Sequence, residues 1–206
     1  MTSPLFAAGQ KLTIVALGDS TTAGTPGFHS PREIPPKGFG NEESQYAYWI
    51  MKKRPYWKII NQGIRAQRTD QILARFDEDV APFRPDYVII LAGVNDLFQG
   101  YGSEQVIRNL AAIYDKAESL KIKVVTCTIL PYNEMSSEAA AEMEKANGWI
   151  RQSAEKRHFI FCDTFHLLED PLNPGHLAGS PDGYHPDVSG YRKMGESIAV
   201  SMEADE

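Results

Sequence analysis

The chain has 206 residues, of which 42% are hydrophobic, so it is long and apolar enough to build one substantial core. We expect a single domain spanning residues 1–206. Its 21 Lys and Arg residues against 27 Asp and Glu residues give a net charge of -6, and no basic cluster of five or more appears. This charge pattern argues against a nucleic-acid partner.

Five short, β-rich apolar runs alternate with longer segments that carry apolar residues at spacings of three and four. The runs are apolar on consecutive positions, as expected for strands buried on both faces. We predict strands at 12–17, 57–61, 87–92, 124–129 and 159–162, and helices at 43–54, 69–80, 103–120, 137–156 and 187–202. This alternation predicts a doubly wound α/β fold in three layers, α/β/α, around a five-stranded parallel sheet.

Two stretches rich in Pro and Gly, 24–41 and 170–186, are predicted to be irregular loops. Cys127 and Cys162 fall within or at the end of apolar runs, which favours two buried thiols over a disulfide.

The first eleven residues lack the basic start and the long apolar stretch of a secretory signal, and no run approaches membrane-spanning length. We therefore expect a cytosolic protein without stable membrane insertion. The oligomeric state cannot be read from the sequence.

Four short motifs carry polar residues suited to chemistry, and three of them directly follow a predicted strand. In an open parallel sheet the residues just past the carboxyl ends of the strands gather along one edge, where such folds bind ligands. The motifs are Gly18-Asp19-Ser20, Asn61-Gln62-Gly63, Gly93-Val94-Asn95-Asp96 and Asp182-Gly183-Tyr184-His185. We expect them to meet in space.

Ser20 is the candidate nucleophile of this group. A serine hydroxyl is a poor nucleophile at neutral pH, so it needs a base and a partner that orients the base. His185 and Asp182, three residues apart, fit these roles. We expect the other histidines, His29, His158, His166 and His176, not to form such a pair with a loop carboxylate.

Acyl transfer also needs hydrogen-bond donors in place where negative charge develops on the carbonyl oxygen. The candidate donors are the backbone amides of Ser20 and Gly63 and the side-chain amide of Asn95. Glycine suits position 63 because a side chain there would crowd a substrate passing close to the backbone.

Ser20, Gly63, Asn95 and His185, in this order, resemble the four-block signature of the SGNH hydrolases, also called the GDSL esterase and lipase family. The resemblance runs from Leu17 to Tyr191. It implies a flavodoxin-like fold, with Ser20 as nucleophile and first oxyanion donor, Gly63 and Asn95 as further donors, His185 as base and Asp182 as its partner.

The motifs depart from the family pattern at Thr21, where leucine is common, and at Ala66, where a further glycine is common. We expect neither position to supply chemistry. Asp19 and Asp96 match family positions, and we expect them to brace their turns rather than act on a substrate.

The sequence contains no recognisable metal-binding or nucleotide-binding motif, and the proposed chemistry needs no cofactor. Arg65 and Arg68 follow Gly63 and could meet an anionic group, but we interpret them as a solvated helix entrance. Several aromatic residues could line a pocket, although none is singled out: Phe28, Phe39, Tyr46, Tyr48, Trp49, Phe98, Tyr101, Tyr132 and Tyr184.

The sequence therefore predicts a serine esterase that hydrolyses carboxylic esters of small soluble substrates through an acyl-enzyme. A carbohydrate O-acetylesterase, or a lysophospholipase or thioesterase of the same family, is the alternative within the enzyme class. A non-catalytic, flavodoxin-like binding module is the alternative outside it. This last reading is disfavoured because a binder has no need for a histidine and acid pair opposite a free serine.

Overall fold

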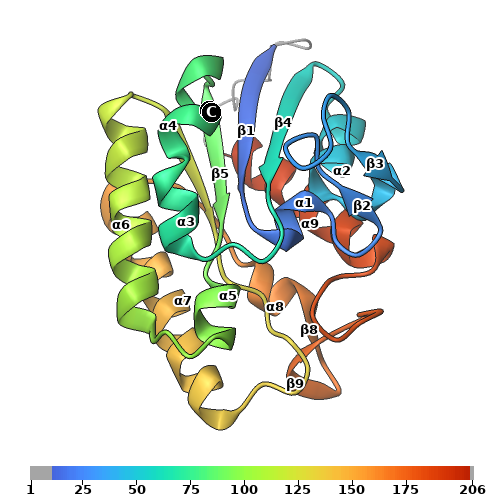
Figure 1. Cartoon of the computed structure of the whole chain (residues 1–206), viewed down its shortest axis with the longest axis vertical. Helices are drawn as coiled ribbons and strands as arrows, with labels where there is room; N and C mark the ends of the chain where they lie inside the picture. The colour runs from blue at the N-terminus through green and yellow to red at the C-terminus, as the bar shows by residue number, and fades with distance from the viewer. Residues whose placement is uncertain (1–10, 205–206) are drawn as a thin grey trace, which may run out of the picture.

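The computed structural model describes residues 11–204, so predictions that concern residues 1–10, including the expected absence of a secretory signal, lie outside the described residues. A five-stranded parallel sheet forms the centre of the molecule (Figure 1). In spatial order its strands are β4 (Trp57–Gly63), β1 (Leu12–Gly18), β5 (Tyr87–Leu91), β6 (Lys123–Cys127) and β7 (Ile160–Cys162). Counted along the chain this is the order 2-1-3-4-5 of a flavodoxin-like sheet, which confirms the predicted fold class.

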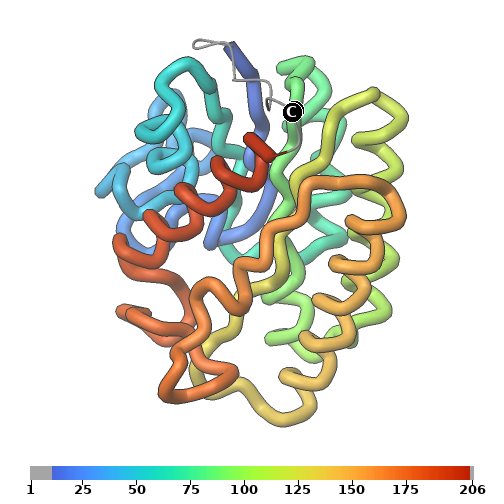
Figure 2. The backbone as a smooth tube through the Cα atoms, turned by 180° about the vertical axis from the view of Figure 1, so that it is seen from behind, coloured from blue at the N-terminus to red at the C-terminus, as the bar shows by residue number. Residues whose placement is uncertain are grey.

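Helices cover both faces of the sheet, as Figures 1 and 2 show from opposite sides. One face packs against α2 (Tyr46–Lys53) and α9 (Val188–Glu203). The other face packs against α3 (Thr69–Ala74), α4 (Phe76–Asp79), α6 (Ser103–Ser119) and α7 (Ser137–Arg157).

The alternation of side chains along β1 shows why the strands read as continuous apolar runs. Ile14 and Ala16 belong to the core on the α2 and α9 face, whereas Val15 and Leu17 belong to the core on the opposite face. Successive side chains of a strand point to opposite faces, so a strand covered on both sides must be apolar at every position.

Short elements fill the edge where the strands end. They include the helices α1 (Ser20–Ala23), α5 (Val94–Phe98) and α8 (Thr164–Leu168) and the 3-10 turn η1 (Glu42–Ser44), whereas a second 3-10 turn, η2 (Ala81–Phe83), leads into the start of β5 at the opposite edge. Two small antiparallel hairpins, β2 (Phe28–His29) with β3 (Phe39–Gly40) and β8 (Glu169–Asp170) with β9 (Asn173–Leu177), lie in or next to the stretches predicted as irregular loops.

The helix predicted at 69–80 is two helices. The break falls at Arg75, whose backbone has φ -99° and ψ 4°, outside the helical range. The two predicted thiols are free and buried, and Cys127 and Cys162 are direct partners in the register between β6 and β7.

Candidate active site

The sheet order places the candidate nucleophile at the point where the strand order reverses. Ser20 follows β1 and Asn95 follows β5, and these two neighbouring strands connect to opposite sides of the sheet. Ser20 is the first residue of α1, and the Asp19 carboxylate caps that helix by accepting a hydrogen bond from the Thr21 amide at 3.0 Å. The Ser20 side chain borders a cavity although only 7% of the residue is exposed.

The structure brings Ser20, His185 and Asp182 into one hydrogen-bonded chain. His185 Nε2 lies 2.9 Å from Ser20 Oγ, and His185 Nδ1 lies 2.7 Å from Asp182 Oδ2. The second carboxylate oxygen of Asp182 accepts hydrogen bonds from the amides of Tyr184 at 2.9 Å and His185 at 2.8 Å. Because both oxygens are engaged, the carboxylate is held in the orientation that fixes the ring of His185.

Partial burial raises the pKa of Asp182, but the hydrogen bonds from the His185 ring and the two amides outweigh it and lower the pKa below its usual value. The carboxylate is therefore ionised at neutral pH. It can stabilise the positive charge that His185 gains when it takes the proton of Ser20.

Asn95 lies on α5 and borders the same cavity as Ser20 and His185. Its side-chain Nδ2 donates to the carbonyl oxygen of Gln67 at 3.0 Å. A carboxamide nitrogen carries two hydrogens, so this bond orients the group and leaves the second hydrogen for another acceptor.

Gly63, the third predicted donor, is placed differently from the expectation. Its amide donates to Asn61 Oδ1 at 2.9 Å, and it is not among the residues that border the Ser20 cavity. A Cβ at position 63 would come within 2.1 Å of the backbone nitrogen of Ala23. Glycine is therefore required because β4 packs against α1, and our prediction that its amide faces a substrate was wrong.

Ala66 borders the cavity in its place. Its φ of 61° lies in the left-handed region that favours glycine, which explains why glycine is common at this family position. Among residues 11–204, neither the Ala66 amide nor the Ser20 amide has a hydrogen-bond acceptor. We expected Ala66 to supply no chemistry, but its place at a position where glycine is common in the family is the signal that could have indicated this residue.

The cavity in front of Ser20 has a volume of about 280 Å³. Three aromatic rings form part of its wall, with centroid separations of 6.0 Å for Phe98 and Tyr132, 5.7 Å for Phe98 and Tyr184, and 5.9 Å for Tyr132 and Tyr184. The sequence offered nine aromatic candidates, and only the tertiary structure selects these three.

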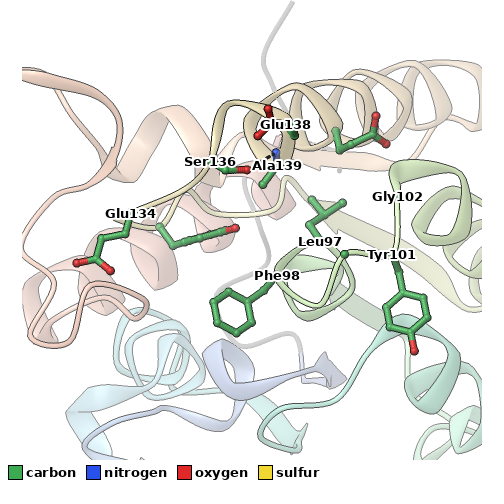
Figure 3. Close-up of a pocket in the computed structure, with 11 residues that line it drawn as sticks. Leu97, Phe98, Tyr101, Gly102, Glu134, Ser136, Glu138 and Ala139 are labelled. Atoms are coloured by element: carbon green, nitrogen blue, oxygen red, sulfur yellow. Dashed lines mark hydrogen bonds between the residues drawn. The ribbon is translucent and has the colours of Figure 1, made fainter.

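A second hollow of about 410 Å³ shares Phe98 and Tyr132 with this cavity. Figure 3 shows Phe98 and Tyr101 on one side of it and, on the other, Glu134 from the segment that leads into α7 and Glu138 from the first turn of α7. The two spaces together offer an apolar aromatic wall next to Ser20 and carboxylates farther away.

Arg65 also borders the Ser20 cavity, which differs from the predicted solvated helix entrance. Its amide and its Nε donate to Glu33 Oε1 at 2.9 Å and 3.2 Å, and its guanidinium contacts His29. Arg65 therefore fastens the long loop after α1 to the edge of the cavity. Arg68 fits the expectation, because it pairs with Asp70 at the start of α3.

Asp19 and Asp96 brace turns, as predicted. The Asp96 carboxylate accepts from the backbone amide and the hydroxyl of Thr69 at 2.9 Å and 2.6 Å, which ties α5 to the start of α3. Burial raises the pKa of Asp96, and the bonds from Thr69 only partly offset it. Burial raises the pKa of Asp19 to about 7, although the hydrogen bond from the Thr21 amide acts in the opposite direction.

The expectation that no other histidine pairs with a loop carboxylate was wrong. His166 Nδ1 lies 3.0 Å from both carboxylate oxygens of Asp163, the residue three positions before it and the cap of α8. Asp163 also forms an ion pair with Arg151. The spacing of the acid and the histidine therefore does not by itself identify the pair beside Ser20, whereas the position of the serine does.

Within residues 11–204 there is no group of three or more His, Cys, Asp or Glu side chains that could hold a metal ion. None of the helices in this part of the chain is long and apolar enough to cross a membrane.

The chain belongs to the GDSL-like Lipase/Acylhydrolase family, whose sequence profile matches residues 16–193. The family is the SGNH hydrolase family, so the resemblance seen in the four motifs is confirmed and the protein is a GDSL-type hydrolase.

Similar proteins include an acetylxylan esterase of Geobacillus stearothermophilus, which is 27% identical over an alignment that covers 65% of this chain and 67% of that protein. The lipoprotein YqeF of Bacillus subtilis is 27% identical over an alignment that covers 90% of this chain and 87% of that protein. Among solved structures, a lipolytic protein of the G-D-S-L family from Desulfitobacterium hafniense superposes with a TM-score of 0.77 at 26% identity, covering 93% of this chain and 99% of that one.

Proposed function

We propose that the protein hydrolyses carboxylic esters of small soluble substrates through an acyl-enzyme formed on Ser20. The observation that carries this proposal is the continuous hydrogen-bonded chain from Asp182 through His185 to Ser20, with distances of 2.7 Å and 2.9 Å. A binding module has no need for this arrangement, whereas nucleophilic catalysis by serine depends on it.

In the proposed reaction Ser20 Oγ attacks the ester carbonyl carbon while His185 Nε2 accepts its proton. His185 then gives this proton to the departing alcohol, which leaves an ester of Ser20. A water molecule then attacks the acyl-enzyme while His185 accepts its proton. His185 returns this proton to Ser20 Oγ, and the carboxylic acid is released.

The negative charge on the carbonyl oxygen needs donors that are already in place. We assign this role to the amides of Ser20 and Ala66 and to the free side-chain hydrogen of Asn95. The cavity that these residues share and the two amides without an acceptor support the assignment. Gly63 is left out of it because its amide is bonded to Asn61.

A cavity of about 280 Å³ suits a short acyl group. The second candidate function is a carbohydrate O-acetylesterase. The adjoining hollow favours it, because aromatic faces and the carboxylates of Glu134 and Glu138 suit a ring that carries hydroxyl groups. The acetylxylan esterase among the relatives points the same way. The same carboxylates disfavour a leaving group that bears phosphate, as in a lysophospholipid or a coenzyme A thioester.

The test is turnover of p-nitrophenyl esters of rising acyl length beside acetylated xylo-oligosaccharides. Ser20→Ala should abolish turnover while circular dichroism shows an unchanged fold. Ser119→Ala is the matched control, since the exposed Ser119 hydroxyl donates to the Lys116 carbonyl at the end of α6. Normal turnover by folded Ser20→Ala protein, or a fluorophosphonate probe that leaves Ser20 unlabelled, would refute the proposal. The cytosolic location stays a prediction.

A further inference from the structure

The guanidinium of Arg75 lies buried at the carboxyl edge of the sheet, next to the segments that carry the candidate active site. Only 8% of the side chain is exposed, although arginine is among the residues least often buried. It stands at the break between α3 and α4, and the mechanism proposed above makes no use of it.

Arg75 contacts four separate groups. Its Nη2 donates to the carbonyl oxygen of Gly18 at 2.8 Å, and its Nη1 donates to the carbonyl oxygen of Gln62 at 2.8 Å. Its Nε donates to the side-chain oxygen of Gln67 at 2.6 Å. The carboxylate of Asp79, only 2% exposed, forms an ion pair with it and balances the charge.

These contacts reach the chain segments on which the catalytic groups stand. Gly18 ends β1 two residues before Ser20. Gln62 and Gln67 lie on either side of the turn that holds Ala66. The carbonyl of Gln67 in turn accepts the hydrogen bond that orients Asn95.

The shape of the guanidinium explains why arginine is needed here. Its planar fork presents five N–H donors in fixed directions, so one side chain can fix several backbone segments relative to one another. A lysine ammonium carries the same charge on a flexible chain, but it cannot reproduce the fork.

We propose that Arg75 is a positioning residue, which fixes the separation between the nucleophile turn and the oxyanion donors Ala66 and Asn95. This inference rests on the proposed function. Among its hydrogen bonds and ion pairs within residues 11–204, none reaches Phe98, Tyr132 or Tyr184, the aromatic wall of the cavity. Loss of the guanidinium fork should therefore reduce the stabilisation of the transition state more than it reduces substrate binding.

The test is Arg75→Lys, with kcat and KM measured on p-nitrophenyl acetate. A misplacement of about 1 Å in such a site can cost about 100-fold, so we expect kcat to fall about 10- to 100-fold. KM should stay within about twofold, which marks an interaction made only in the transition state. Arg32→Lys is the matched control, because Arg32 bonds Asp79 at 2.9 Å and Glu78 at 3.1 Å. Within residues 11–204 it makes no hydrogen bond to Gly18, Gln62 or Gln67, so this variant should keep normal kinetics.

Gln67→Ala removes the hydrogen bond from Arg75 Nε and leaves the charge of Arg75 in place. This variant therefore tests the positioning role even if the Arg75→Lys protein does not fold. Gln67→Ala should lower kcat at constant KM. Its effect on kcat should be smaller when it is combined with Arg75→Lys than in the unaltered protein, because both substitutions break the hydrogen bond between Arg75 and Gln67. Folded Arg75→Lys or Gln67→Ala protein with unchanged kcat, or with the loss confined to KM, would overturn the positioning role. Absence of ester turnover in the unaltered protein would instead refute the proposed function.

Discussion

Asp19 is the carboxylate whose environment should make stability depend on pH. It is 1% exposed, next to the nucleophile, and burial raises its pKa from 3.8 to about 7. The folded state therefore favours the protonated form. The favourable contribution is complete below pH 3.8 and is lost as the pH rises through about 7.

The size of the effect follows from the two pKa values. Each tenfold change in the proton equilibrium corresponds to about 1.4 kcal/mol, so the ionised carboxylate lowers the free energy of unfolding by about 4 kcal/mol well above pH 7. Between pH 5 and pH 8 the loss from this one group amounts to about 2 to 3 kcal/mol.

Asp19→Asn removes the titration and keeps an oxygen that can accept from the Thr21 amide, so the cap of α1 is retained. Urea unfolding from pH 5 to pH 8 should show a smaller decline in unfolding free energy for this variant than for the unaltered protein. Asp77→Asn is the control, because Asp77 is an exposed carboxylate paired with Lys116, and its profile should follow that of the unaltered protein. Parallel declines for Asp19→Asn and the unaltered protein would show that Asp19 is not the titrating group.

Two further substitutions test Asn95 as an oxyanion donor and Gly63 as a packing residue. Asn95→Ala removes a proposed donor and should lower kcat on p-nitrophenyl acetate by about 10²- to 10³-fold. Asn173→Ala is the control, because the exposed Asn173 side chain bonds the Asp170 carboxylate away from the cavity, and equal rates for the two variants would exclude Asn95 as an oxyanion donor. Gly63→Ala places a Cβ 2.1 Å from the backbone of Ala23 and should lower the midpoint of thermal unfolding, because overpacking costs about 1–3 kcal/mol. Gly148→Ala in α7 is the control, because a Cβ there meets nothing within 4 Å, and it should leave the midpoint unchanged or raise it. An unchanged midpoint for Gly63→Ala would contradict the packing of β4 on α1.

The sequence by itself determined the five strands, the longer helices and the order of the layers. Strands buried on both faces must be apolar throughout, and helices of three turns or more show their buried stripe, so both patterns are visible without tertiary information. Ser20, His185, Asp182 and Asn95 could also be placed near one another, because they follow or approach the carboxyl edge of a parallel sheet.

Only the tertiary structure decided what lies between the long elements. The helices α1, α5 and α8 have four or five residues, too few to show a period, and they exist because the surrounding chain holds them. The same is true of the buried Arg75, whose partners are separated from it by up to 57 positions in sequence.

The exchange of Gly63 for Ala66 shows the limit most clearly. A glycine in a motif indicates that a side chain would collide there, but the sequence does not say with what. At position 63 the obstacle is the backbone of α1, whereas the left-handed turn that brings an unpaired amide to the cavity contains an alanine. Which amide faces the substrate depends on how β4, α1 and the turn after β4 pack together. This packing brings together residues that are far apart in the chain, so it cannot be read from the sequence.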